Sequence, residues 1–65
     1  MANDSDRAEL STLQSQLDDV TRRVVAVSDG YRDTPDSLIV AELDAAERNL
    51  LAASRAVARA VKTLR

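Results

Sequence analysis

DGYRDTP, at residues 29–35, holds the only glycine and the only proline of this 65-residue chain. Asp29-Gly30 predicts a helix end, because glycine adopts the left-handed conformation after a helix without a steric clash. Thr34-Pro35 predicts a helix start, with Thr34 as N-cap and Pro35 in the first turn, where its missing N–H is not needed. Residues 29–34 are therefore predicted to form a short corner that folds one helix back antiparallel to another.

Upstream of this corner, apolar residues recur at alternating spacings of three and four, which is the pattern of a heptad seam. Its members are Leu10, Leu13, Leu17, Val20, Val24, Val27 and Tyr31. Because a strand would show alternation with period two, we predict a helix over about residues 6–28. The pair Asp18-Asp19 precedes the pair Arg22-Arg23 by four residues, a spacing that favours ion pairs along a helix.

Downstream of the corner, a second seam predicts a helix over about residues 35–64. Its members are Ile39, Leu43, Ala46, Leu50, Ala53, Val57, Ala60 and Leu64. Large residues alternate with alanine after Ile39, and alanine lets helix axes approach closely, which favours an antiparallel bundle. Further apolar residues widen this face, as expected of a helix with two neighbours. The predicted self-association core comprises Leu43, Leu50, Leu51, Val57, Val61 and Leu64.

The size of the chain indicates that this core is completed by association. A single domain of 65 residues rarely gains more than about 3–5 kcal/mol from its own core. Cysteine and histidine are both absent, so disulfides and the common zinc sites are excluded. We therefore predict an all-α fold over residues 1–65, an antiparallel helical hairpin with coiled-coil packing that dimerises into a homodimeric four-helix bundle.

Charge is divided unevenly along the chain. Residues 1–47 contain all eleven acids and four of the nine bases, whereas residues 48–65 contain the other five bases. An antiparallel hairpin places the acidic beginning beside the basic end, which a parallel pair would not. Helix spacing places four bases on one outward face, and we name them the basic stripe: Arg48, Arg55, Arg59 and Lys62.

The basic stripe is the main candidate binding face. Such a row of cations can follow the phosphates of a nucleic acid. However, the net charge is −2 and only 2% of the residues are aromatic, which gives little for bases to stack on. A solvated face or a protein partner is therefore favoured, and nucleic-acid binding is the alternative.

The sequence offers little for catalysis. The acids at the corner, Asp29, Asp33 and Asp36, lack the spacing of a calcium loop and are explained as helix-end and solvating residues. We predict no catalytic, cofactor-binding or metal-binding residue and therefore no enzyme. The residues from 50 to 64 are amphipathic enough to lie on an anionic membrane, but their apolar side is mostly alanine, so core packing explains them better.

The remaining predictions concern setting and role. No apolar run approaches the ~20 residues that span a bilayer, and the first residues lack the basic and apolar parts of a signal peptide. We expect a cytoplasmic protein with no membrane partner and no cofactor. Its expected role is that of a small interaction protein (an adaptor, regulator or assembly factor) that works through helix–helix packing.

Overall fold

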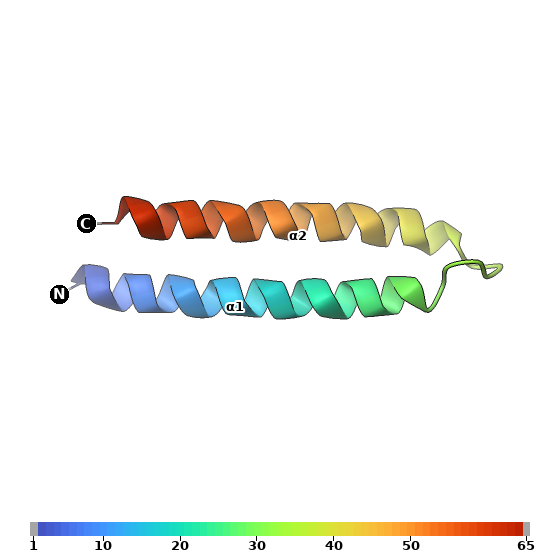
Figure 1. Ribbon diagram of the computed structural model, residues 1–65, viewed down its shortest axis with the longest axis horizontal. Helices are drawn as coiled ribbons and strands as arrows, with labels where there is room; N and C mark the ends of the chain where they lie inside the picture. The colour runs from blue at the N-terminus through green and yellow to red at the C-terminus, as the bar shows by residue number, and fades with distance from the viewer. Residues whose placement is uncertain (1, 65) are drawn as a thin grey trace.

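The computed structural model describes residues 2–64 as two long helices packed side by side (Figure 1). Helix α1 spans Ala2–Asp29 and helix α2 spans Leu38–Thr63, and no strand occurs among these residues. The chain reverses at the corner, so the beginning of α1 and the end of α2 lie together (Figure 1). The predicted all-α antiparallel helical hairpin is thus confirmed.

The hairpin is a long, thin layer rather than a sphere. Its Cα atoms extend 53 × 14 × 10 Å, with a radius of gyration of 15.3 Å. A compact domain of this length has a radius of gyration of about 11 Å. A layer of two helices gives each helix only one neighbour, so each helix keeps most of its surface in contact with solvent.

The helix boundaries differ from those predicted. Helix α1 begins at Ala2, not near residue 6, and Asp4 in its first turn lies favourably at the positive end of the helix dipole. Helix α2 begins at Leu38, three residues after the predicted start at Pro35. The predicted N-cap is also wrong, because the Thr34 hydroxyl donates to the Tyr31 carbonyl oxygen at 2.7 Å instead of capping α2.

The corner from residue 30 to residue 37 is wound from tight turns. The Tyr31 N–H bonds to the Ser28 carbonyl, and the Ser37 N–H bonds to the Thr34 carbonyl, each three residues back. The left-handed residue is Asp33, with φ of 62°, whereas Gly30 has no positive φ. The prediction that Gly30 ends α1 in the left-handed conformation is therefore wrong. A Cβ on Gly30 would lie 3.3 Å from the Val27 carbonyl oxygen, a contact that requires a small local shift.

Arg32 links the corner to both helices. Its Nε donates to Asp29 at 3.1 Å and its Nη2 donates to Asp44 at 2.9 Å. Hydrogen bonds to Asp44 and Asp29 raise the pKa of Arg32 above its already high ordinary value. When the pKa of a cation is raised, its contribution to stability is lost only when the pH rises through that pKa. Arg32 therefore stays charged at neutral and acidic pH.

The line of contact between the helices is built from small polar residues as well as apolar ones. The buried residues whose side chains the structure describes are Thr21, Ser28 and Ser54, and none is hydrophobic. Thr21 donates its hydroxyl to the Leu17 carbonyl oxygen at 2.7 Å, which satisfies it within α1. Small side chains at these positions allow the two helices to meet, while the large apolar residues lie beside the contact line.

The predicted seams are therefore only partly used within the hairpin. In α1, Leu10, Leu17 and Val24 are partly buried, but the residues between them stay exposed: 38% for Leu13, 41% for Val20 and 52% for Val27. In α2, Leu43, Leu50 and Val57 are partly buried, whereas Ile39, Ala53 and Ala60 are exposed. One contact line buries one side of each seam, and the other side faces solvent.

Candidate interaction surfaces

An open apolar groove runs along one face of the hairpin. It consists of two hollows of about 420 and 380 Å³ that adjoin at Val20, which lines both. We name as the apolar groove the hydrophobic residues that line them: Leu13, Leu17, Val20, Val24, Val27, Leu43 and Val57. Gln16 and Arg23 are the polar lining residues. A monomeric protein rarely exposes a row of valine and leucine side chains of this length to solvent.

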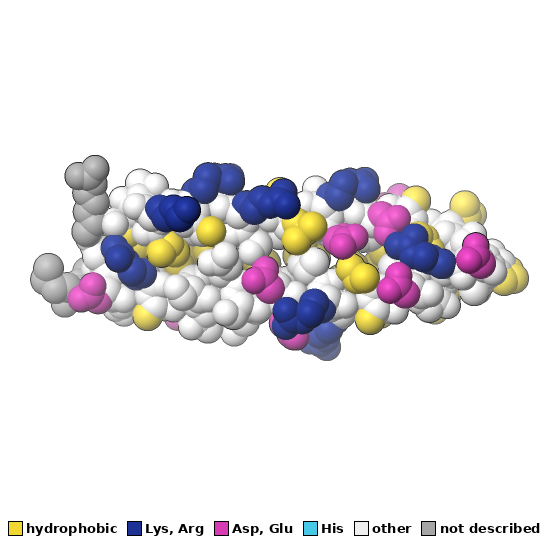
Figure 2. All heavy atoms as spheres, viewed as in Figure 1, with side chains coloured by type: hydrophobic (Ala, Val, Ile, Leu, Met, Phe, Trp, Pro, Cys, Tyr) yellow, Lys and Arg dark blue, Asp and Glu magenta, His cyan; other side chains and the backbone are white. Residues whose placement is uncertain are grey.

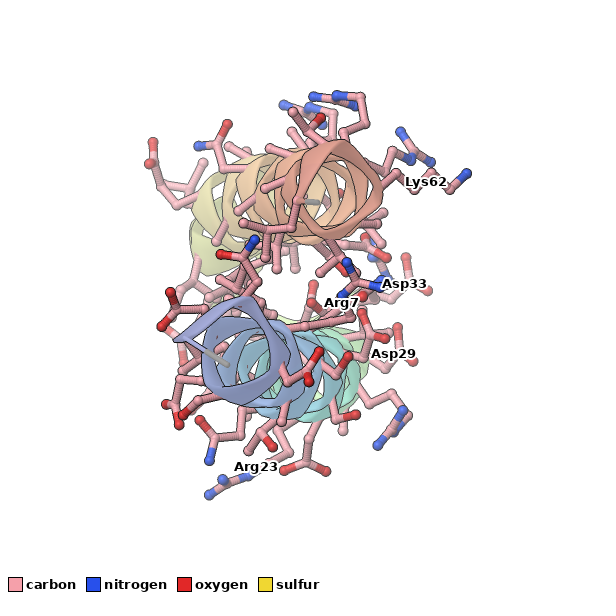
Figure 3. All side chains as sticks on the ribbon, turned by 90° about the vertical axis from the view of Figure 1, so that its left-hand side faces the viewer. Arg7, Arg23, Asp29, Asp33 and Lys62 are labelled. Carbon is pink, nitrogen blue, oxygen red and sulfur yellow. The ribbon has the colours of Figure 1, made fainter. Side chains whose placement is uncertain are left out.

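The opposite face is closed by polar contacts between the helices, and we call it the polar face. Arg7 donates to the Leu64 carbonyl oxygen, Ser54 donates to Asp18, and Arg32 donates to Asp44, each at 2.9 Å. Asp18 and Val20 are separated by about 200° around α1, which places them on opposite sides of the contact line. Figure 3 shows Arg7 reaching toward α2, whereas Arg23 lies on the side of α1 away from α2.

The flank of the groove on α2 is made of small residues. Ala53 is displaced by about 100° from Ser54, whose hydroxyl marks the polar face, so Ala53 lies toward the apolar groove. Ala46 and Ala60 follow at intervals of seven residues and share this side of α2. The groove is thus lined mainly by α1, with Leu43 and Val57 as its α2 residues and these alanines beside them.

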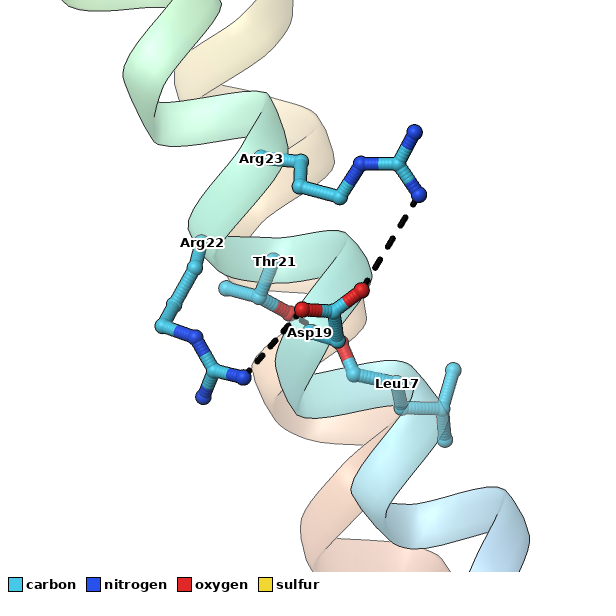
Figure 4. Close-up of polar contacts among 5 residues, drawn as sticks. All are labelled: Leu17, Asp19, Thr21, Arg22 and Arg23. Carbon is cyan, nitrogen blue, oxygen red and sulfur yellow. Dashed lines mark hydrogen bonds and ion pairs between the residues drawn. The ribbon is translucent and has the colours of Figure 1, made fainter.

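The outer side of α1 carries a local ion-pair cluster. Asp19 accepts from Arg22 at 3.3 Å and lies 3.9 Å from an Arg23 nitrogen, as Figure 4 shows. The predicted pairing of acids and bases four residues apart is thus present for Asp19, whereas Asp18 turns to Ser54 on α2. Exposed pairs of this kind contribute little to stability, so the cluster solvates this face.

The basic stripe lies along the outer edge of α2. Arg48, Arg55, Arg59 and Lys62 are all exposed, and in Figure 3 Lys62 projects from α2 to the side on which Arg7 lies. Figure 2 shows basic side chains gathered along this edge. Among the described residues, the ion pairs involve Arg22, Arg23 and Arg32 but no member of the stripe. Asp44, four residues before Arg48, pairs with Arg32 instead.

The residues predicted as self-association core do not all lie together. Leu43 and Val57 line the apolar groove, and Leu50, Val61 and Leu64 are partly buried along the contact line. Leu51 is separate. It lies seven residues after Asp44, on the same side of α2 as the Arg32–Asp44 contact, and is 36% exposed. The prediction of this core omitted the groove residues of α1, of which Leu13, Val20 and Val27 are exposed.

No group of three or more carboxylates within residues 2–64 is placed to hold a metal ion. Neither α1 nor α2 combines the length and the apolar character needed to cross a membrane.

Comparison with known proteins does not extend the description. No protein-family model, no curated protein and no solved structure matches this chain. The function has to be inferred from the surfaces themselves.

Proposed function

We propose that this protein is a small non-enzymatic interaction protein that works by packing its apolar groove against helices of a partner. The observation that carries the proposal is the absence of any buried hydrophobic residue among those described, together with a groove of two adjoining hollows lined by leucine and valine. Burial of apolar surface is the main driving force of folding and association, and the hairpin leaves this surface in water. An adaptor, a regulator or an assembly factor would use it in the same way.

The interaction we propose is coiled-coil packing in the cytoplasm. Coiled-coil packing against two further helices would bury the exposed half of both seams, and a second copy of the chain is the first candidate partner. We place the interaction in the cytoplasm, because disulfides are rare there and this chain contains no cysteine.

Photo-crosslinking in the cells that make the protein tests the proposal. A photoreactive residue at Val20 lies in the groove, and the same residue at Ser15 lies on the exposed outer side of α1. We expect a discrete adduct from position 20 and none from position 15, whichever protein supplies the partner helices. If position 20 gives no more adduct than position 15, the groove is not an interaction surface and the proposal fails.

A second candidate function is nucleic-acid binding through the basic stripe. The observation in its favour is that all four cations are exposed and take no part in the ion pairs of the described residues. Cations that are already neutralised by carboxylates bind phosphates poorly, and these four are not. The stripe belongs to α2 alone and does not overlap the apolar groove, so both functions can reside in one protein.

A further inference from the structure

The excess surface of the hairpin matches the area that one partner buries in a stable complex. A compact monomer of its mass, 7.1 kDa, exposes about 4,100 Å². The hairpin exposes 4885 Å². The excess of about 800 Å² is the area that each partner contributes to a standard protein–protein interface. A single partner with an elongated apolar face of similar size is therefore enough to complete the core.

The distribution of charge along the hairpin indicates how such a partner would lie. The contact of Ser54 with Asp18 marks the middle of the hairpin. The corner half, residues 18–48, carries eight acids and four bases, whereas residues 2–17 and 49–64 together carry three acids and four bases. One half is therefore strongly acidic and the other slightly basic. A second hairpin stacked with its corner at the same end would place the two acidic halves together, whereas a reversed one would place each acidic half against a basic half.

We infer, on the basis of the proposed function, that the apolar groove is covered by a second copy of this chain, reversed end for end. A two-fold axis across the middle of the hairpin then places α1 beside its counterpart in the partner copy and α2 beside its counterpart. The axis crosses α2 near Ala53, so Ala53 meets the same residue of the other copy, and Ala46 meets Ala60. Alanine at these positions permits the close approach of two α2 helices.

The basic stripe stays outside this interface. Arg55 is displaced by about 200° around α2 from Ala53, so the stripe lies on the side of α2 away from the two-fold axis. Each copy of the reversed dimer therefore keeps its own stripe of four cations exposed to solvent.

Disulfide formation from single-cysteine variants tests the inference, since the natural chain contains no cysteine. Ala53→Cys places a thiol at the two-fold axis. Ala52→Cys, at the next residue, is the matched control because it points to the exposed outer side of α2. We expect Ala53→Cys to oxidise to a covalent dimer at least about tenfold faster than Ala52→Cys, because the dimer raises the local thiol concentration. Circular dichroism and sedimentation equilibrium should show an unchanged helical dimer for both reduced variants.

Two other outcomes overturn the inference in different ways. A mixture of Val20→Cys and Ala53→Cys that yields the mixed disulfide, with Ala53→Cys alone no faster than the control, would show that α1 lies beside the partner's α2 and that the corners share one end. A natural chain that sediments as a monomer over a hundredfold concentration range would show that the groove receives a different protein. In that case photo-crosslinking from position 20 still tests the proposed function.

Discussion

At the scale of single residues, Ser28 stands out because its hydroxyl has no partner. The side chain is 1% exposed and its oxygen makes no hydrogen bond within the hairpin. Thr21 and Ser54, the other two buried residues, both donate their hydroxyls. A buried hydroxyl without a partner costs about 1–3 kcal/mol, so Ser28 serves the contact line by its small size alone.

Replacing Ser28 with alanine is therefore expected to stabilise the protein. Ser28→Ala removes the unpaired oxygen, keeps the side chain small and should raise the free energy of unfolding by about 1–2 kcal/mol. Ser15→Ala is the control, since the exposed outer side of α1 gains only the helix propensity of alanine, at most about 0.7 kcal/mol. Urea denaturation at one protein concentration compares them. A loss of stability in Ser28→Ala alone would mean that the hydroxyl is bound in the working assembly.

The strained residue of the corner provides a second prediction at this scale. Asp33 has a φ of 62°, which aspartate tolerates better than branched residues do. Asp33→Val should cost about 1–2 kcal/mol, whereas Asp36→Val, an equal change in charge and size without the positive φ, should stay within about 0.5 kcal/mol. Thermal unfolding of both variants measures the difference. Equal melting temperatures would show that the corner relaxes around Asp33.

At the scale of helices and corner, the sequence predicts the existence of the elements better than their edges. Two heptad patterns on either side of Gly30 and Pro35 are sufficient to predict two antiparallel helices. The start of α2 at Leu38 was missed because Thr34 bonds to the Tyr31 carbonyl and Asp33, not Gly30, takes the left-handed conformation. Neither choice has a strong signal in the sequence, since glycine and an N-cap threonine are the commoner solutions.

The contact line was missed for a different reason. Thr21 and Ser28 lie four residues after Leu17 and Val24, and Ser54 lies four residues after Leu50. The recurrence of a small polar residue at that offset was the available signal. A hydrophobic pattern indicates which residues can be buried, but not which of them are. Because a layer of two helices has one contact line, the small residues beside the seam are buried on it, whereas Val20 and Val27 remain exposed. The groove follows from this shift.

Matched substitutions at Leu50 and Leu51 distinguish the side of α2 on the contact line from the side beside the polar face. Leu50→Asp puts a carboxylate among the partly buried residues of the contact line and should remove about 3 kcal/mol or more, nearly all the stability expected of such a chain. Leu51→Asp makes the same change at a residue that is 36% exposed beside the polar face, and should cost about 1 kcal/mol.

Circular dichroism at 222 nm during thermal unfolding distinguishes these two variants. We expect Leu50→Asp to lose its helical signal at room temperature and Leu51→Asp to keep it. Full helicity in Leu50→Asp would show that this leucine is not part of the core. Loss of helicity in both would place Leu51 in the core as well, as the sequence prediction had it.

At the scale of the whole molecule, the elongated hairpin separates its surfaces so that each can serve a different purpose. The apolar groove lies beside the contact line on one face, the polar contacts close the other, and the basic stripe follows the outer edge of α2. Completing the core through the groove leaves the stripe free. In the reversed dimer each stripe stays on the side of α2 away from the partner copy, so binding of an anionic polymer should need one stripe and should not depend on the dimer.

The covalent Ala53→Cys dimer tests whether binding requires one stripe or two. We expect it to bind double-stranded RNA or DNA at low salt, with an affinity that falls linearly with salt on a logarithmic scale as the phosphates release counterions. The reduced protein, diluted until it dissociates, should bind with a similar affinity per stripe, because each copy offers the same four cations. Adding Arg55→Glu and Arg59→Glu to the covalent dimer should abolish binding, whereas adding Arg22→Glu and Arg23→Glu, an equal change of charge on α1, should weaken it only slightly.

Equal losses in both double variants would show that net charge alone sets the affinity. Absence of binding at the lowest salt would leave helix packing as the function to pursue, because a free row of cations that ignores phosphates at low ionic strength is only a solvated face.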